Sequence, residues 1–265
     1  MQPIVATSIA PRNIEIQQIA IKSWLELGFS VTSLNLPEEV NHLSPFFREV
    51  NFLATDRSGK ELYGKDYMYI NDMIVYLKNH GNGLCGIINS DIIIRADSHF
   101  LRLLESEYES SLILASRWDI DALGDQGGSL FDVGFDVFFF DQNILSSFPP
   151  SKFCLGVPWW DYWTPLIAAQ NGFSIKCLVS PVIYHLKHQT NYDQDLWNRV
   201  GMEFLKQYDG MLYESLLKEA RNTLFPQFTP VLISILLQQS AQRFLVDTRK
   251  ISQSIFYAPH PEIVR

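Results

Sequence analysis

The fold of this chain is decided by residues 84–94, which read LCGIINSDIII. Residues 84–88 are almost entirely apolar, which is typical of a central strand buried on both faces of a parallel sheet. The polar triplet Asn89-Ser90-Asp91 interrupts the run before three isoleucines follow. A buried acid costs free energy unless it is paired, hydrogen-bonded or metal-bound, and ligands of open α/β sheets bind at strand ends. The triplet is therefore the main functional candidate, and an Asx turn at a bulge is the alternative.

Upstream of this stretch the pattern predicts a βαβ unit. Residues 4–6 form a short apolar, β-branched run that predicts a strand, and a second strand is predicted over residues 29–36. Between them, Asn13 is placed to cap a helix that ends before Gly28. The predicted inward face of this helix has helical spacing and consists of Ile16, Ile19, Ala20, Trp24 and Leu27. Two strands joined by one helix require a parallel pair with a right-handed crossover.

Downstream, strands and helices continue to alternate. The sequence predicts helices that begin at Asp66 and at Asp97, and a later helix with Thr164 as its cap and Pro165 in its first turn. Further strands are predicted over residues 112–116, 133–140 and 174–184. The predicted class is α/β, a mostly parallel sheet sandwiched by helices. We expect a domain over residues 1–190, with halves of about 1–95 and 96–190, and a helical extension over 191–265.

Composition limits the class of protein. Hydrophobic residues make up 47% and charged residues 19%, which excludes a mainly disordered chain. The formal net charge of −8 argues against binding to duplex nucleic acid, which requires a basic face. Three scattered cysteines form neither a disulfide framework nor a metal-ligand spacing. No secretory leader and no apolar run long enough to span a bilayer are seen, so we expect a cytoplasmic protein.

The initial strand, loop and helix, followed by an apolar strand that ends in an Asp-x-Asp-like triplet, resemble the GT-A superfamily of nucleotide-sugar glycosyltransferases. The resemblance implies that Asp91, the last residue of the triplet, binds a divalent cation, Mn²⁺ or Mg²⁺, that bridges the two phosphates of the donor. It implies that Asn89 faces the ribose and that Ser90 lies in the nucleotide site. Asn89 stands where the family has an acid, so the cation has one carboxylate fewer here.

The resemblance also implies a histidine after the last strand that completes the coordination of the cation. Tyr184-His185-Leu186-Lys187-His188 offers two. Residues at odd spacing on a strand point to opposite faces, so we expect only one of them to join Asp91. His185 is chosen for its position at the strand end, and a histidine bonded to backbone is the alternative.

The loop after the first strand is the part that grips the nucleotide in this superfamily. By position, Thr7 and Ser8 are expected to contact the base or ribose, and Arg12 to pair with a phosphate. Asn35, at the end of the second strand, and Lys65, before the next helix, are further nucleotide-binding candidates. Each has a plainer explanation as a turn former or a solvated side chain.

Asp161 is the candidate catalytic base, because inverting members of the family place such a carboxylate at the start of a helix after the acceptor-side strands. It lies among aromatic side chains in residues 158–163, PWWDYW. Desolvation by these rings is expected to raise its pKa. Trp159 and Trp160 are expected to stack on an acceptor sugar, with core packing as the alternative. Asp136 is predicted either to bind acceptor hydroxyls or to face solvent.

Together these features predict an inverting, metal-assisted transfer of a sugar from a nucleotide-diphosphate donor to a hydroxyl of a glycan, lipid or small molecule. A nucleotidyltransferase on a related fold is disfavoured because residues 7–12 contain no glycine. A non-catalytic nucleotide- or carbohydrate-binding domain is the other alternative, which Asn89 favours. Residues 231–237 are the most apolar part of the tail and are expected to pack internally. A homodimer contact and peripheral attachment to a membrane are the alternatives.

Overall fold

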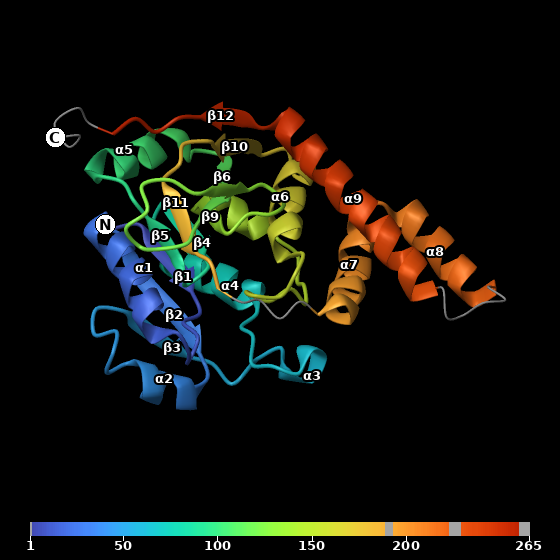
Figure 1. The fold of residues 1–265 in the computed structure, drawn as a ribbon, viewed down its shortest axis with the longest axis horizontal. Helices are drawn as coiled ribbons and strands as arrows, with labels where there is room; N and C mark the ends of the chain where they lie inside the picture. The colour runs from blue at the N-terminus through green and yellow to red at the C-terminus, as the bar shows by residue number, and fades with distance from the viewer. Residues whose placement is uncertain (1, 189–192, 223–228, 260–265) are drawn as a thin grey trace.

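The computed structural model describes residues 2–188, 193–222 and 229–259. Most strands form one eight-stranded sheet (Figure 1). In spatial order, these strands are β12 (Gln253–Ile255), β10 (Ser174–Leu178), β6 (Ser111–Ala115), β9 (Val137–Asp141), β4 (Leu84–Ile88), β1 (Ile4–Thr7), β2 (Ser30–Asn35) and β3 (Asn51–Ala54). The order of the smaller, four-stranded sheet is β5 (Ile92–Ile94), β11 (Ile183–Leu186), β7 (Arg117–Ile120) and β8 (Ser129–Phe131).

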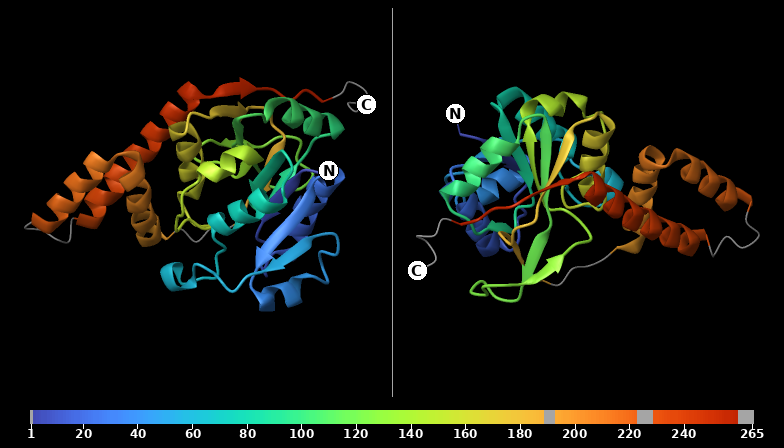
Figure 2. Two further views of the ribbon diagram at one scale, coloured as in Figure 1. Left: turned by 180° about the vertical axis from the view of Figure 1, so that it is seen from behind. Right: turned by 90° about the horizontal axis from the view of Figure 1, so that it is seen from above.

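Helices cover both faces of the main sheet. Along the chain they are α1 (Ile14–Glu26), α2 (Pro37–Leu43), α3 (Lys60–Tyr63), α4 (Ile70–His80), α5 (Ser98–Glu107), the 3₁₀ helix η1 (Gln142–Ser147), α6 (Trp160–Gln170), α7 (Gln194–Tyr208), α8 (Gly210–Asn222) and α9 (Thr229–Ile251). One face packs on α1 and α5, the other on α4, α6 and the C-terminal helices (Figure 2). Successive strand residues alternate between the two cores: Phe138 belongs to one and Phe139 to the other. The predicted helix-flanked α/β class is confirmed.

The main sheet is parallel except at β9, which lies antiparallel between β4 and β6. Ile88 is the register partner of Val137. One residue beyond this pair, the backbone N–H of Asn89 donates to the carbonyl of Asp136 at 3.1 Å. The ladder therefore brings the triplet next to Asp136, although 47 residues separate Asn89 from it along the chain.

The smaller sheet begins where the triplet ends. β11 pairs antiparallel with β5 and parallel with β7, so that His185 is the register partner of both Ile92 and Asp119. The prediction of one strand over residues 174–184 is wrong, because β10 belongs to the main sheet and β11 to the smaller one. The break falls next to Pro181, which has no N–H to donate to a ladder.

Three predicted helix details are also corrected. α6 begins at Trp160 rather than at Thr164, and the Thr164 hydroxyl donates to the Trp160 carbonyl at 2.8 Å within the helix. α4 begins at Ile70. In α1 the buried set is Gln17, Ala20, Ile21 and Trp24, whereas Ile19 is 39% exposed. The buried face of α1 is thus shifted from the predicted one, because it includes a glutamine whose polar groups are used inside the molecule.

The C-terminal part of the chain is joined to the sheet. α7 and α9 pack against α6, and β12 extends the main sheet as a parallel neighbour of β10. The α8–α9 pair projects away from the sheet (Figure 1). Residues 231–237 lie in α9, where Leu237 is fully buried and Val231, Leu232 and Ile235 are exposed. Within the described ranges, no helix has the length and apolarity to cross a bilayer.

Candidate functional site

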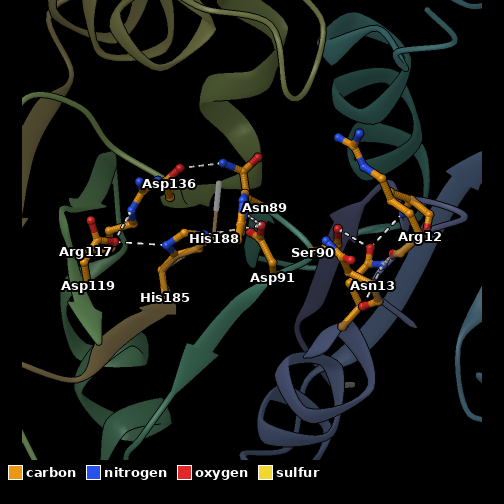
Figure 3. A network of polar contacts seen from close by, with 12 residues as sticks. Arg12, Asn13, Asn89, Ser90, Asp91, Arg117, Asp119, Asp136, His185 and His188 are labelled. Carbon is orange, nitrogen blue, oxygen red and sulfur yellow. Dashed lines mark hydrogen bonds and ion pairs between the residues drawn. The ribbon is translucent and has the colours of Figure 1, made fainter. Parts of the chain in front are cut away.

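Asp91 and two histidines meet at the junction of the two sheets. The Nε2 atoms of His185 and His188 each lie 3.6 Å from Oδ2 of Asp91. One ligand atom from each of the three residues falls within 4.8 Å of the others. Asp91 ends the loop between β4 and β5, His185 lies in β11, and His188 follows two residues after the end of β11 (Figure 3). The predicted proximity of Asp91 and His185 is therefore present in the structure.

His188 joins the same group, which corrects the expectation that only one histidine reaches Asp91. The alternation of strand faces does not extend to His188, because β11 ends at Leu186. His188 lies beyond the strand, where the backbone no longer alternates, and its ring packs edge-on to that of His185 with centroids 5.0 Å apart. Both imidazoles therefore face one carboxylate.

This donor set fits a divalent cation. Two imidazole nitrogens and one carboxylate oxygen suit Mn²⁺, Fe²⁺ and Zn²⁺ better than Mg²⁺, which prefers oxygen ligands and water. Burial raises the pKa of Asp91, but when His185 and His188 are protonated, their hydrogen bonds and positive charge outweigh burial and hold this pKa well below its usual range. Asp91 is thus favoured in its ionised form, which is the form that binds metal.

A chain of hydrogen bonds links this group to Asp136. His185 Nδ1 lies 3.0 Å from Oδ1 of Asp119, and the same oxygen accepts from Arg117 Nε at 2.8 Å. Arg117 also donates to Oδ2 of Asp136 at 2.9 Å. Asp136 Oδ1 in turn accepts from the side-chain amide of Asn89 at 2.5 Å, which closes the path back to the triplet (Figure 3).

Asn89 therefore has a partner that an acid in its place would repel. Its amide group donates to a carboxylate, which an aspartate at the same position cannot do unless it is protonated. Asp136 is 8% exposed and bonded on both oxygens. The alternative that Asp136 faces solvent is therefore wrong, and the structure makes Asp136 an internal link between Asn89 and Arg117.

Asp161 lies in the first turn of α6, and its surroundings raise the pKa of its carboxyl group. Desolvation, together with the negative charge of Asp136, raises the pKa of Asp161 to about 7. Backbone N–H groups of Phe135, Asp161 and Tyr162 oppose this shift, and the Phe135 N–H donates to Oδ2 at 3.3 Å. Gly134 lies against the carboxylate, since a Cβ there would come within 2.8 Å of Oδ2. A carboxyl of this pKa can exchange a proton near neutral pH.

The loop after β1 is shaped by Gln17 of α1. Its side-chain amide donates to the carbonyls of Ala10 and Arg12, and its Oε1 accepts from the Ala10 N–H at 2.7 Å and from the Ser90 hydroxyl at 2.7 Å. Ser90 is thereby attached to the loop that was predicted to bind the nucleotide. Arg12 is exposed, and its side chain extends on the Ser90 side of the site (Figure 3).

Two predicted nucleotide contacts are corrected to internal roles. Thr7 is fully buried and donates to the Ile88 carbonyl at 2.7 Å. Asn35 is also fully buried and donates to the Ile9 carbonyl and to Glu39, each at 2.9 Å. Neither side chain has a surface left for a ligand. Ser8 is partly exposed in the same loop, and Lys65 is exposed between α3 and α4.

The tryptophans predicted to stack on an acceptor belong to the core instead. Trp159 is 1% and Trp160 3% exposed. The Trp159 ring packs on Trp197 and Phe204 of α7, with centroids 4.7 and 5.1 Å away, and its Nε1 donates to the Trp197 carbonyl. The aromatic cluster after Pro158 thus attaches the C-terminal helices to the α/β body, because these helices need a large apolar surface to pack on.

Sequence reasoning missed Arg117 and Asp119 as site residues. β7 is only four residues long, and its residues are partly polar and half-buried, so no apolar run marks it. The available signal was the two-residue spacing of the opposite charges, which places both side chains on one face of a strand. Gln17 was missed because a glutamine on an otherwise apolar helix does not stand out.

No family model and no curated protein matches this sequence. Among solved structures, a mannosyltransferase from Pyrobaculum calidifontis, in complex with GDP-Man and Mn²⁺, is similar over 95% of this chain and 74% of its own, with 11% identity and a TM-score of 0.49. HddC from Yersinia pseudotuberculosis covers 71% of this chain and 90% of its own (12% identity, TM-score 0.39). A 4-diphosphocytidyl-2C-methyl-D-erythritol synthase from Anaerococcus prevotii is similar over 74% of this chain and 95% of its own, with 7% identity and a TM-score of 0.42. These similarities concern the path of the backbone only and say nothing about which side chains would carry a reaction.

Proposed function

We propose that this protein is a glycosyltransferase that moves a sugar from a nucleotide-diphosphate donor to an acceptor hydroxyl. The observation that carries the proposal is that the surroundings of two carboxyl groups shift their pKa values in opposite directions. Asp161 has a pKa raised to about 7, whereas Asp91 sits against two histidines that lower its pKa. Separated acid and base environments of this kind mark sites of proton and charge transfer.

In this proposal Asp161 is the general base. Its carboxylate takes the proton of the acceptor hydroxyl as the oxygen attacks the anomeric carbon, and the bond from that carbon to the donor's β-phosphate oxygen breaks. A base with a pKa of about 7 combines a large deprotonated fraction at neutral pH with a strong pull on the proton. One direct displacement inverts the configuration at the anomeric carbon. The backbone N–H of Phe135 holds the carboxylate in place.

Asp91, His185 and His188 would hold a divalent cation. When bound, the cation supplies positive charge that stabilises the departing diphosphate. Asp119 orients the His185 ring through Nδ1, and Ser90, bonded to Gln17, fixes the neighbouring loop. Ser8 and Arg12 remain proposed contacts of the nucleotide, on the exposed side of that loop.

Asn89 supports an active enzyme over a degenerate binding domain. Its amide is bonded to Asp136, and Asp136 is bonded to Arg117. The replaced acid thus belongs to a complete network of partners. Loss of function by drift would leave unsatisfied groups instead.

The test combines binding with turnover. Thermal shifts are measured with UDP, GDP, ADP, CMP and dTDP, with and without Mn²⁺, for wild type and Asp91→Ala. Release of nucleoside diphosphate from the matching nucleotide sugar is then followed with a set of acceptors. We expect one nucleotide to give an Mn²⁺-enhanced shift that Asp91→Ala loses. We also expect Asp161→Asn to keep the shift and to lose turnover by about a hundredfold or more.

Asp132→Asn is the matched control, because Asp132 is an exposed acid in the loop before Gly134. Full turnover by Asp161→Asn contradicts the assignment of the base. Pyrophosphate release from a nucleoside triphosphate and a sugar phosphate identifies a nucleotidyltransferase instead. The absence of a shift with every nucleotide, on folded protein, contradicts nucleotide binding altogether.

A further inference from the structure

Arg117 lies between Asp119, which contacts His185, and Asp136, which contacts Asn89. Its side chain is 17% exposed and bonded to two acids, Asp119 at 2.8 Å and Asp136 at 2.9 Å. Its guanidinium lies over the ring of Phe131 in β8, 4.1 Å from the centroid. The Phe131 ring covers one face of the guanidinium, and the N–H groups at the edge of the guanidinium donate to the two carboxylates. The orientation of Arg117 is therefore fixed from two directions.

The contact with Asp119 bears on the state of His185. A carboxylate only accepts hydrogen bonds, so Nδ1 of His185 must carry a hydrogen to bond to it. In the neutral ring this leaves Nε2 with its lone pair, and Nε2 is the atom that faces Asp91. In metal-binding histidines, a hydrogen-bond partner of the ring nitrogen that does not bind the metal sets the tautomer and the ring orientation. Because Arg117 bonds to the same Oδ1, it determines where that oxygen lies.

The contact with Asp136 bears on the triplet. Asp136 holds Asn89 through the other oxygen of its carboxylate. Asn89 is two residues before Asp91, in the connection between β4 and β5. The guanidinium of Arg117 therefore holds Asp119, which contacts the ligand His185. It also holds Asp136, which contacts Asn89, two residues before the ligand Asp91.

We propose that Arg117 is the positioning residue of the metal centre, which holds Asp119 and Asp136 so that His185 presents Nε2 toward Asp91. The proposal rests on the proposed function for its metal. The arrangement requires the planar fork of arginine. A lysine carries the same charge on a single nitrogen and cannot match both carboxylates in fixed directions. The charge-conserving change Arg117→Lys therefore separates positioning from electrostatics.

The experiment has one readout without metal and one with it. In the metal-free protein, ¹⁵N–¹H correlation spectra at a pH where the ring is neutral report the tautomer of His185, assigned by comparison with His185→Gln. We expect wild type to show Nδ1–H alone and Arg117→Lys to show a mixture of tautomers. Mn²⁺ titrated alone, followed by calorimetry, should bind Arg117→Lys about ten- to a hundredfold more weakly than wild type.

Arg95→Lys is the matched control. Like Arg117, Arg95 lies over an aromatic ring, 4.4 Å from the Tyr184 centroid, but its guanidinium donates to the backbone carbonyls of Leu123 and Asp125 in the β7–β8 connection. No side chain of the Asp119–Asp136 network is among its hydrogen-bond partners in the described structure. We expect it to match wild type in both readouts while sharing any general loss of stability.

The outcomes separate the two proposals. An unchanged tautomer and unchanged Mn²⁺ affinity in folded Arg117→Lys overturn the role of Arg117. If wild type binds no Mn²⁺ but the tautomer still changes in Arg117→Lys, the metal of the proposed function is overturned and the positioning of His185 stands. If Arg117→Lys does not fold, Asp119→Leu tests the same link, because leucine removes the oxygen that accepts from both Arg117 and His185. A pure Nδ1–H tautomer and full affinity in that variant overturn the proposal.

Discussion

Asp161 keeps its proton to higher pH than an ordinary carboxyl because the fold removes its water and places Asp136 nearby. The unfolded chain restores both the water and the distance. The two states therefore bind different numbers of protons between about pH 4 and pH 7, where the folded state holds the proton more tightly. The consequence is a stability that falls as pH rises through this window and stays low above it.

Replacement of Asp161 by asparagine removes the group that causes this fall. We expect Asp161→Asn to be more stable than wild type at pH 8.5 by about 2 to 4 kcal/mol, and closer to wild type at pH 4.5. Urea unfolding at the two pH values measures the difference, and subtraction of wild type cancels the other titrating groups. A variant equal to wild type at pH 8.5 would show that the Asp161 carboxyl is not desolvated.

Asn89 and Asp136 give a second prediction for single residues. Asn89→Asp replaces a donor with a second carboxylate at 2.5 Å, so we expect a loss of about 2 kcal/mol at neutral pH. The exchanged pair Asn89→Asp with Asp136→Asn restores one donor and one acceptor and should recover about half of that loss. Chemical denaturation of the four proteins forms a double-mutant cycle. A cycle without coupling would contradict the contact.

Among the elements, the segment that leads into β9 sets the position of Asp161. Tyr162 Oη donates to the Val133 carbonyl at 2.6 Å, Gly134 leaves room for the carboxylate, and the Phe135 N–H donates to it. α6 and this segment therefore hold each other. A change of backbone position here moves the proposed base without altering its chemistry.

Gly134→Ala tests this dependence. The new Cβ would lie 2.8 Å from Asp161 Oδ2, so the carboxylate or the segment must move. We expect turnover to fall about tenfold or more, with a small change in melting temperature. Gly124→Ala is the control, because a Cβ at that glycine meets nothing within 4 Å. If both variants have the same turnover, the position of the segment before β9 does not affect the reaction.

The elements also differ in how far sequence predicts them. β1, β4 and β6 are mostly apolar runs that are buried on both faces, and this composition makes them visible in the sequence. β7 and β8 are short and only partly apolar, and β7 is held by its pairing with the distant strand β11 on one side and with β8 on the other. The site depends on this second kind of element. Asp91 and His185 were therefore predictable from strand ends, whereas Arg117 and Asp119 required the register of the smaller sheet.

At the scale of the whole molecule, the C-terminal helices and the α/β body share one core. Leu237 of α9 and Phe204 of α7 are fully buried in the cluster that contains Trp159 and Trp163. The large aromatic side chains before and within α6 therefore pack the C-terminal helices against the α/β body. We infer that the body and these helices unfold together.

Leu237→Ala is the test of this cooperativity. We expect a loss of about 2 to 4 kcal/mol and one unfolding transition seen equally by tryptophan fluorescence and by backbone circular dichroism. Leu232→Ala, in the same helix but at a side chain that is 40% exposed, should change stability by less than about 0.5 kcal/mol. Two separate transitions would show that the C-terminal helices form an independent unit.

The place of β12 beside β10 has a consequence for synthesis on the ribosome. Every other strand of the main sheet is translated before α7, yet β10 acquires its outer neighbour only after α9 has been made. Until then the nascent sheet exposes a row of unpaired N–H and C=O groups, which is the feature that templates association between chains. A product released before Gln253 retains that open edge, so premature termination late in the message yields a polypeptide prone to self-association, although nearly all of the sheet has been made.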